Sequence, residues 1–386
     1  MFSVMPFGFL FIFVFILGTV LSLSSLHWIG IWVGLEVNLM GFIPILVYRG
    51  ITQETESGMK YFIIQALGSG MIMLGSLSCF NTSFSWELVS LKSSMFAMIP
   101  LLFGLMLKLG SFPFHFWLPS VMAGISWLGC MVLTTWQKVA PMFLLSSLLC
   151  SWVEESLLLG GIFLAIAGFS SIVGGIGGLN QTQVRSLLAY SSIGHIGWML
   201  FCCVCGDDIL KVYFVIYFTV SICIFLVLWF FELSFFNQSG FVLLEKSKMS
   251  QVYLIVMLLS LGGMPPLLGF VGKWLVIWLA CSGKFPFCVV LLLVGSLVSL
   301  FYYLSLLFSV MFFSGCSLVF VGSYLSCLKF SDNVSASGDL NLKLSEKTLL
   351  GEFSNFSVLV MSSFIIMLNL VGGVFIYLSL LLCDFV

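Results

Sequence analysis

The chain has 386 residues, of which 61% are hydrophobic and 8% charged, and its mean hydropathy is +1.21. Soluble domains carry roughly 25% charged residues, so this composition excludes an ordinary soluble protein. The 14 basic and 15 acidic residues nearly cancel, which excludes a polybasic surface for nucleic acid. The sequence therefore predicts an all-α, polytopic membrane protein that lies in a lipid bilayer and binds no nucleic acid.

A membrane-spanning helix needs about 20 apolar residues, and eleven segments of roughly that length follow one another along the chain. The stretch 313–353 begins apolar and ends polar, so we expect a polar surface loop before the last helix. No part of the sequence suits a soluble domain, which predicts a single transmembrane domain over 1–386. The eleven segments are 4–23, 27–47, 58–80, 94–122, 124–150, 157–178, 183–205, 209–233, 251–280, 286–312 and 356–382.

Basic residues in the connections between segments predict which way the chain crosses the membrane. Seven lie in or beside even-numbered connections, and three lie in or beside odd-numbered ones. The N-terminus and the even-numbered connections should therefore face the compartment of synthesis. The seven are Arg49, Arg185, Lys246, Lys248, Lys329, Lys343 and Lys347, and the three are Lys92, Lys211 and Lys284.

Two segments, 94–122 and 251–280, are longer than a span requires and are interrupted by glycine and proline. A lysine lies beside each interruption, Lys108 in the first and Lys273 in the second. The segments are five spans apart, so equivalent elements cross in opposite directions, which is typical of inverted repeats with paired broken helices. The alternative is two unrelated kinks. The interruptions are Gly110-Ser111-Phe112-Pro113 and Gly262-Gly263-Met264-Pro265-Pro266.

Ionisable residues inside predicted spans are candidates for ion handling, because a charge at the bilayer centre costs ~3 kcal/mol on insertion scales. Moving a charge near a buried lysine would make the amine take up or release a proton. The alternative is a structural ion pair between Glu36 and a lysine, and we expect Glu36 and Lys108 to lie within ion-pair reach. The candidates at this depth are Glu36, Lys108, Lys138, His195 and Lys273.

Local sequence predicts a polar site beside Lys138 and adds His115 and Lys60 to the candidates. Pro141 has no N–H, so a helix carbonyl beside Lys138 loses its donor and leaves a polar notch. His195 and His115 can titrate near neutral pH or simply hydrogen-bond a carbonyl. Lys60 opens the segment 58–80 and either joins a relay or extends to the interface.

The cysteines predict neither a disulfide framework nor a metal site. Most of the 12 lie in apolar segments. The run Cys202-Cys203-Val204-Cys205 contains one C-x-x-C, but a zinc or Fe–S site needs a second pair or nearby histidines. We therefore interpret the cysteines as small apolar residues.

Several motifs together resemble the chain 2 family of mitochondrial NADH:ubiquinone oxidoreductase, respiratory complex I. They occur in the family's order over about 26–275. The C-terminal third matches mainly by hydrophobicity. The motifs are Gly34-Leu35-Glu36-Val37-Asn38, Met59-Lys60-Tyr61-Phe62, Lys108-Leu109-Gly110, Pro113-Phe114-His115-Phe116-Trp117-Leu118-Pro119, Trp136-Gln137-Lys138, Ala140-Pro141, Gly178-Leu179-Asn180-Gln181-Thr182-Gln183, Ala189-Tyr190-Ser191-Ser192-Ile193-Gly194-His195 and Leu261-Gly262-Gly263-Met264-Pro265-Pro266.

The resemblance implies an antiporter-like fold related to Mrp-type cation/proton antiporters, in the shortened form that animal members have. It implies that Glu36 pairs with Lys108, that Lys138 is the central lysine and that Lys273 is the distal one. The family commonly has Pro-Lys-Trp where this chain has Gly272-Lys273-Trp274, so we expect a looser backbone there.

The resemblance also implies a function, a proton-translocating membrane-arm subunit in the mitochondrial inner membrane. The chain itself would hold no cofactor, because FMN, Fe–S clusters and ubiquinone are used by partner subunits. One alternative is an Mrp-type cation/proton antiporter subunit, which sodium-dependent transport by the isolated chain would favour. Another is a structural spacer of the membrane arm that does not pump, which a normal proton-to-electron ratio after neutralising Lys138 would favour.

The predicted orientation is testable by protease accessibility. We expect the loop 331–347 to resist a protease added to the intermembrane side of mitoplasts, because the even-numbered connections face the matrix. The same protease should cut the loop once the inner membrane is permeabilised. Cleavage in intact mitoplasts would contradict the orientation.

Overall fold

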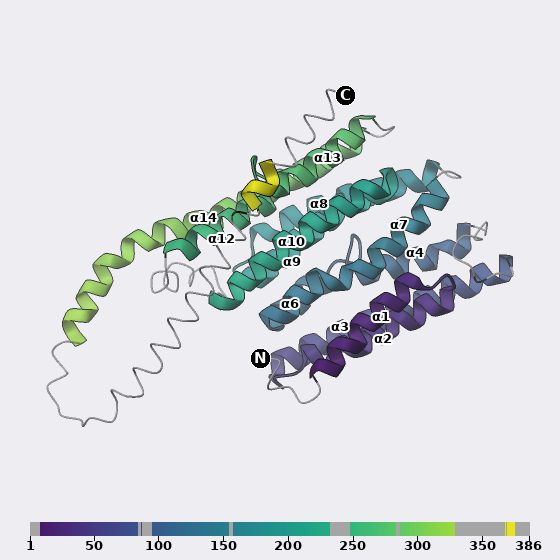
Figure 1. Ribbon diagram of the computed structural model, residues 1–386, viewed down its shortest axis with the longest axis horizontal. Helices are drawn as coiled ribbons and strands as arrows, with labels where there is room; N and C mark the ends of the chain where they lie inside the picture. Colours follow the sequence, from purple (N-terminus) through teal and green to yellow (C-terminus); the bar gives the residue numbers. More distant parts are fainter. Residues whose placement is uncertain are drawn as a thin grey trace. The chain divides into compact units, whose positions relative to one another are not determined.

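The computed structural model describes residues 8–83, 86, 95–153, 157–231, 248–282, 286–328, 367 and 369–374, and its elements in these ranges are helices (Figure 1). The all-α prediction is confirmed. The helices are α1 (Gly8–Ser24), α2 (Trp28–Leu46), α3 (Thr52–Ser83), α4 (Met95–Leu109), α5 (Trp117–Gly124), α6 (Trp127–Thr134), the 3-10 turn η2 (Trp136–Lys138), α7 (Val139–Val153), α8 (Leu157–Leu179), α9 (Val184–Cys205), α10 (Asp207–Phe231), α12 (Lys248–Gly262), α13 (Leu268–Ser282) and α14 (Pro286–Leu328).

Within the described ranges, seven helical stretches are long and apolar enough to cross a membrane, and four shorter apolar helices accompany them. The first ten predicted segments each coincide with a helix or with a broken run of helices. The eleventh, 356–382, lies almost wholly outside the described residues. The seven stretches are Trp28–Leu46, Thr52–Asn81, Trp127–Cys150, Leu159–Leu179, Val184–Cys205, Asp207–Trp229 and Phe287–Phe308.

Helix α14 continues to Leu328, so the predicted helix end at residue 312 is wrong. The stretch 313–328 is rich in apolar residues and contains no proline, so nothing in the sequence forces the helix to stop. The polar remainder of the predicted loop, 329–353, lies outside the described residues.

The chain divides into two compact units. The first comprises Met1–Leu226 with Gly272–Ser299, and the second comprises Val227–Val271 with Leu300–Val386. Helices α10, α13 and α14 each pass from one unit to the other. The prediction of one transmembrane domain over 1–386 stays a prediction.

In the first unit, helices that follow one another in sequence pack as antiparallel neighbours: α1 on α2, α3 on α4 and α8 on α9 (Figure 1). Helix α7 contacts α1, α4 and α9 and so lies inside the unit. In lipid such packing rests on van der Waals contact and interhelical hydrogen bonds. One such bond joins η2 to α1, where the indole Nε1 of Trp136 donates to Thr19 Oγ1 at 3.2 Å.

Both predicted helix breaks are present, and their backbones are alike. Gly110 after α4 has φ 72° and Gly263 after α12 has φ 80°. In each break the N–H groups of the glycine and of the next residue donate to one carbonyl of the last helical turn. These carbonyls belong to Met106 and Leu259, at N···O distances between 3.0 and 3.3 Å. Each glycine N–H also lies within hydrogen-bond distance of a second carbonyl, that of Leu107 at 3.3 Å and that of Ser260 at 3.1 Å, which completes the Schellman pattern at a left-handed glycine. The inversion of the repeat stays a prediction.

Replacing Gly110 with alanine tests this turn. The new Cβ would lie 3.0 Å from Leu118 and 3.2 Å from Trp117, and a left-handed residue with a side chain costs about 1–2 kcal/mol. We expect Gly110→Ala to lower the thermal unfolding temperature of the detergent-purified chain. The matched control is Gly70→Ala in α3, where a Cβ meets no atom within 4 Å. Equal unfolding temperatures for the two variants would contradict the account.

Candidate functional site

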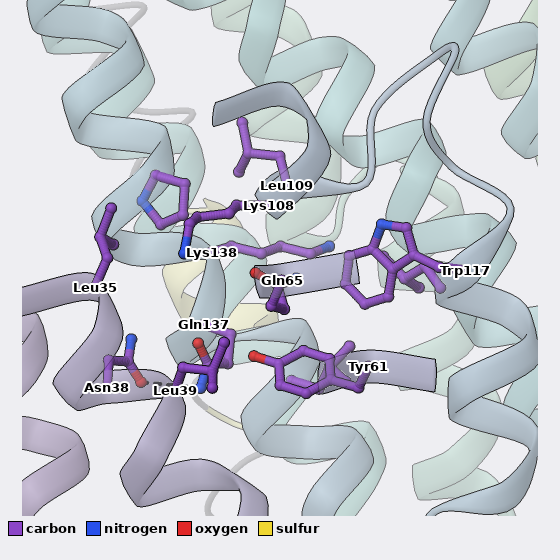
Figure 2. Close-up of a pocket in the computed structure, with 13 residues that line it drawn as sticks. Leu35, Asn38, Leu39, Tyr61, Gln65, Lys108, Leu109, Trp117, Gln137 and Lys138 are labelled. Carbon is purple, nitrogen blue, oxygen red and sulfur yellow. Dashed lines mark hydrogen bonds between the residues drawn. The ribbon is translucent and has the colours of Figure 1, made fainter. Parts of the chain in front are cut away.

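A small cavity lies inside the first unit, beside the first helix break and the η2 turn (Figure 2). Its volume of about 20 Å³ gives room for roughly one water molecule. Helices α2 to α7 all contribute to its wall. The lining residues are Leu35, Asn38, Leu39, Tyr61, Gln65, Lys108, Leu109, Trp117, Leu118, Leu133, Gln137, Lys138 and Pro141.

Two lysines share this cavity, and each stands at an interruption of its helix. Lys108 is in the last turn of α4 and 7% exposed, and Lys138 ends η2 and is 2% exposed. Over the described residues, neither amine has a carboxylate oxygen within 4.0 Å. The cavity therefore holds two buried amines beside neutral polar groups, an arrangement that is costly inside a membrane.

Neutral amides form part of the cavity wall. Gln137 Nε2 donates to Asn38 Oδ1 at 3.0 Å, which joins η2 to α2. In the view of Figure 2, Leu35 and Asn38 lie on one side of the lysines, and Tyr61 and Trp117 lie on the other. Gln137 and Pro141 line the cavity together with Lys108, and the polar notch predicted beside Lys138 stays a prediction.

Glu36 acts on Lys108 through its charge but does not touch it. It is the acidic residue whose electrostatic interaction reaches the Lys108 amine. In the described chain no N···O distance within 4.0 Å joins the two, so they form no contact ion pair there, and their pairing at a longer distance stays a prediction. Leu35 faces the cavity, and successive helical residues turn by about 100°. Glu36 therefore points toward the face that carries Val33 and Met40, which are 42% and 60% exposed.

The Lys138 amine reaches across to α9 and α10. Its Nζ donates to the Tyr217 hydroxyl at 3.3 Å and to the Ser192 carbonyl at 3.4 Å, and it lies 5.2 Å from the centre of the Tyr217 ring. The Tyr217 hydroxyl in turn donates to the Thr134 carbonyl at 3.3 Å, at the end of α6. These distances are long for hydrogen bonds, so neutral oxygens hold the amine loosely.

His195 lies one helical turn after Ser192 on α9. Its Nδ1 is 2.9 Å from the Tyr213 hydroxyl, and its ring centre is 5.1 Å from that of Tyr217. The charges of both Lys138 and Lys273 act on the imidazole. His195 therefore lies within electrostatic range of both the central and the distal lysine.

Lys273 is 8% exposed in α13, and its amine lies 5.9 Å from the centre of the Trp198 ring, at cation–π range. The looser backbone expected at Gly272 is not found, since α13 is continuous through this residue. A Cβ at Gly272 would lie only 3.0 Å from the Tyr213 ring. The glycine thus allows close packing of α13 on α10.

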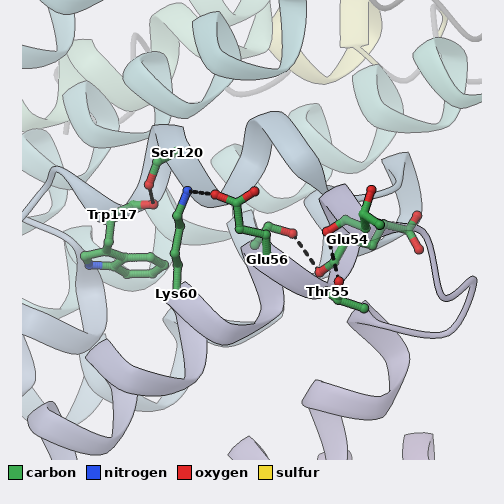
Figure 3. A network of polar contacts seen from close by, with 8 residues as sticks. Glu54, Thr55, Glu56, Lys60, Trp117 and Ser120 are labelled. Atoms are coloured by element: carbon green, nitrogen blue, oxygen red, sulfur yellow. Dashed lines mark hydrogen bonds and ion pairs between the residues drawn. The ribbon is translucent and has the colours of Figure 1, made fainter.

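Lys60 and His115 lie apart from these contacts. Lys60 is about half exposed and its Nζ lies 2.6 Å from Glu56 Oε1, one turn earlier on α3 (Figure 3). His115 is 6% exposed, with its ring centre 4.0 Å from that of Phe116, and its Nδ1 has no hydrogen-bond partner among the described residues. In the part of the chain that the structure describes, neither side chain lines the cavity or hydrogen-bonds to the Lys138 amine.

Sequence reasoning missed the two tyrosines on α10. A signal was present, because Tyr213 and Tyr217 are four residues apart in an apolar segment and so share one helix face. Among the described residues, no three histidine, cysteine or acidic side chains lie close enough together to hold a metal ion.

Comparison with known proteins finds a family and close relatives. The model of the family "NADH:quinone oxidoreductase/Mrp antiporter, TM" matches residues 25–299. NADH-ubiquinone oxidoreductase chain 2 of Lumbricus terrestris is 39% identical, over 77% of this chain and 84% of the relative. NADH-ubiquinone oxidoreductase chain 2 of Locusta migratoria is 36% identical, over 76% of this chain and 82% of the relative.

Solved structures resemble the chain in fold. A chain in respiratory complex I from Thermus thermophilus with bound aureothin has a TM-score of 0.74 and 25% identity, and the likeness covers 96% of this chain and 79% of that one. A chain in the Mrp complex from Dietzia has a TM-score of 0.70 and 16% identity, and the likeness covers 78% of this chain and 60% of that one. At that identity, the second likeness concerns the fold alone.

Proposed function

Since the chain belongs to the NADH-ubiquinone oxidoreductase chain 2 family, we propose that it carries protons through the membrane arm of respiratory complex I along its buried amines and His195. It is an antiporter-like membrane subunit of NADH:ubiquinone oxidoreductase. The observation that carries the proposed route is the contact of Lys138 with α9 and α10, next to a histidine on which two lysines act.

The proposed relay runs from Glu36 through Lys108, Lys138 and His195 to Lys273. Each step has a physical link: the Glu36 charge acts on Lys108, and the first two lysines share a cavity. Both Lys138 and Lys273 then act on His195. Because like charges repel, a proton gained at one group disfavours a proton on the next, so charge can move stepwise along the line. Lys60 and His115 are left out of this relay.

Energy would reach the relay through electrostatic interactions with neighbouring charges, because this chain carries out no redox reaction itself. The antiporter-like membrane subunits carry no redox cofactor themselves. NADH oxidation and quinone reduction, with FMN and Fe–S clusters, would therefore take place in partner subunits. We place the chain in the mitochondrial inner membrane with its N-terminus in the matrix, beside other membrane-arm subunits.

Two alternative functions are distinguished from the proposed one by experiment. An Mrp-type cation/proton antiporter subunit would use the same fold and the same lysines, and sodium-dependent transport by the isolated chain would favour it. A spacer that holds the membrane arm together without pumping would leave proton translocation intact when the relay is neutralised.

Lys138→Met tests the relay directly. Methionine keeps the apolar volume and removes the charge, so we expect quinone reductase turnover and proton pumping by the assembled complex to fall roughly tenfold. Oxidation of NADH by an artificial acceptor should hold its rate, because the redox cofactors lie elsewhere.

The matched control for Lys138→Met is Lys211→Met. Lys211 is exposed on α10 and lies 3.0 Å from Asp208, so its loss should leave turnover nearly unchanged. Normal pumping in an assembled Lys138→Met complex would refute the relay and favour the spacer.

A further inference from the structure

The Tyr217 hydroxyl is the side-chain group that contacts Lys138 and can act as either donor or acceptor. It receives a hydrogen bond from Lys138 Nζ and gives one to the Thr134 carbonyl. Among the described residues, the amine's other hydrogen-bond partner is the carbonyl of Ser192, which can only accept. Tyr217 is therefore the contact whose hydrogen-bond direction can reverse.

This reversal matters because a lysine in a relay exists in two forms. The ammonium form only donates, and it finds acceptors in Tyr217 and in the Ser192 carbonyl. The neutral amine has a lone pair that needs a donor, and a carbonyl cannot supply one. A hydroxyl can supply it by turning its O–H away from the Thr134 carbonyl and toward Nζ, without any change in its own covalent bonds.

The Tyr213 hydroxyl can likewise either donate a hydrogen bond to His195 or accept one from it. Its hydroxyl is 2.9 Å from Nδ1, which is a donor in one tautomer and an acceptor in the other. The ring is held close to α13, because Gly272 has no side chain to displace it. One face of α10 thus presents a reversible hydroxyl to each of two consecutive relay groups.

We propose that Tyr217 and Tyr213 are positioning residues that keep Lys138 and His195 hydrogen-bonded in both of their protonation states. This inference rests on the proposed function. The proton itself passes between the relay groups, and each tyrosine keeps its own O–H bond and only turns it. Other titratable groups around this pair are Lys273, which acts on His195, and Lys108 and Tyr61, which line the cavity with Lys138.

The test is Tyr217→Phe in the assembled complex, which keeps the ring beside the Lys138 amine and removes only the hydroxyl. We expect quinone reductase turnover to fall roughly five- to tenfold, the worth of one buried hydrogen bond. The pH profile of turnover should move by about half a unit or more, because one protonation state loses its partner. NADH oxidation by an artificial acceptor should stay normal.

The matched control is Tyr190→Phe, the same chemical change on α9, where the ring packs against Gly177 and takes part in none of the hydrogen bonds that the described residues make to Lys138 or His195. A Tyr217→Phe complex that behaves like Tyr190→Phe would overturn the inference. A fall in turnover with an unmoved pH profile would also overturn it, since that is the signature of packing alone. If Tyr217→Phe fails to assemble, Tyr213→Phe is judged by the same criteria.

Failure of this inference is distinguishable from failure of the relay. If Lys138→Met loses pumping while Tyr217→Phe keeps a normal pH profile, only the role of the tyrosines is wrong. If Lys138→Met pumps normally, the proposed function itself is wrong.

Discussion

The structure depends on one constraint: amines buried in a membrane-spanning bundle need oxygen partners, and an unbroken helix offers few. Lys138 meets this constraint at η2, where its amine reaches the Tyr217 hydroxyl and the Ser192 carbonyl, and Lys108 lies at the end of α4 on a cavity with room for about one water molecule. The break after α4 and the η2 turn leave a cavity and expose carbonyls such as that of Thr134. No carboxylate of the described chain contacts either amine, and the two oxygens that the Lys138 amine reaches are neutral. A neutral environment that tolerates both charge states is what a proton carrier requires.

The same constraint explains why the helix breaks are built so regularly. Gly110 and Gly263 end α4 and α12 with the same left-handed turn and the same carbonyl bonds. Such a turn closes a helix without leaving its last carbonyls unbonded in lipid. Neighbouring helices then hold the break in place, as the bond from Trp136 to Thr19 does for η2.

Much of this could be predicted from the sequence, for a physical reason. Apolar segment length fixes membrane helices, and glycine with proline fixes breaks, so the helices and both interruptions followed from local composition. The neighbours that a side chain meets depend on how the helices pack, and local sequence does not determine this packing. Glu36 therefore acts on Lys108 without touching it, and the partners of Tyr217 and Tyr213, Lys138 and His195, depend on how α10 packs against η2 and α9.

The central claim is that charge passes between the central and distal lysines through His195. It is tested most directly by counting protons translocated per electron in liposomes that contain an assembled His195→Gln complex. Glutamine keeps a hydrogen-bonding side chain of similar reach but cannot take up a proton. The account predicts a lower proton-to-electron ratio than that of the unaltered complex. An unchanged ratio at normal quinone reductase turnover would contradict it.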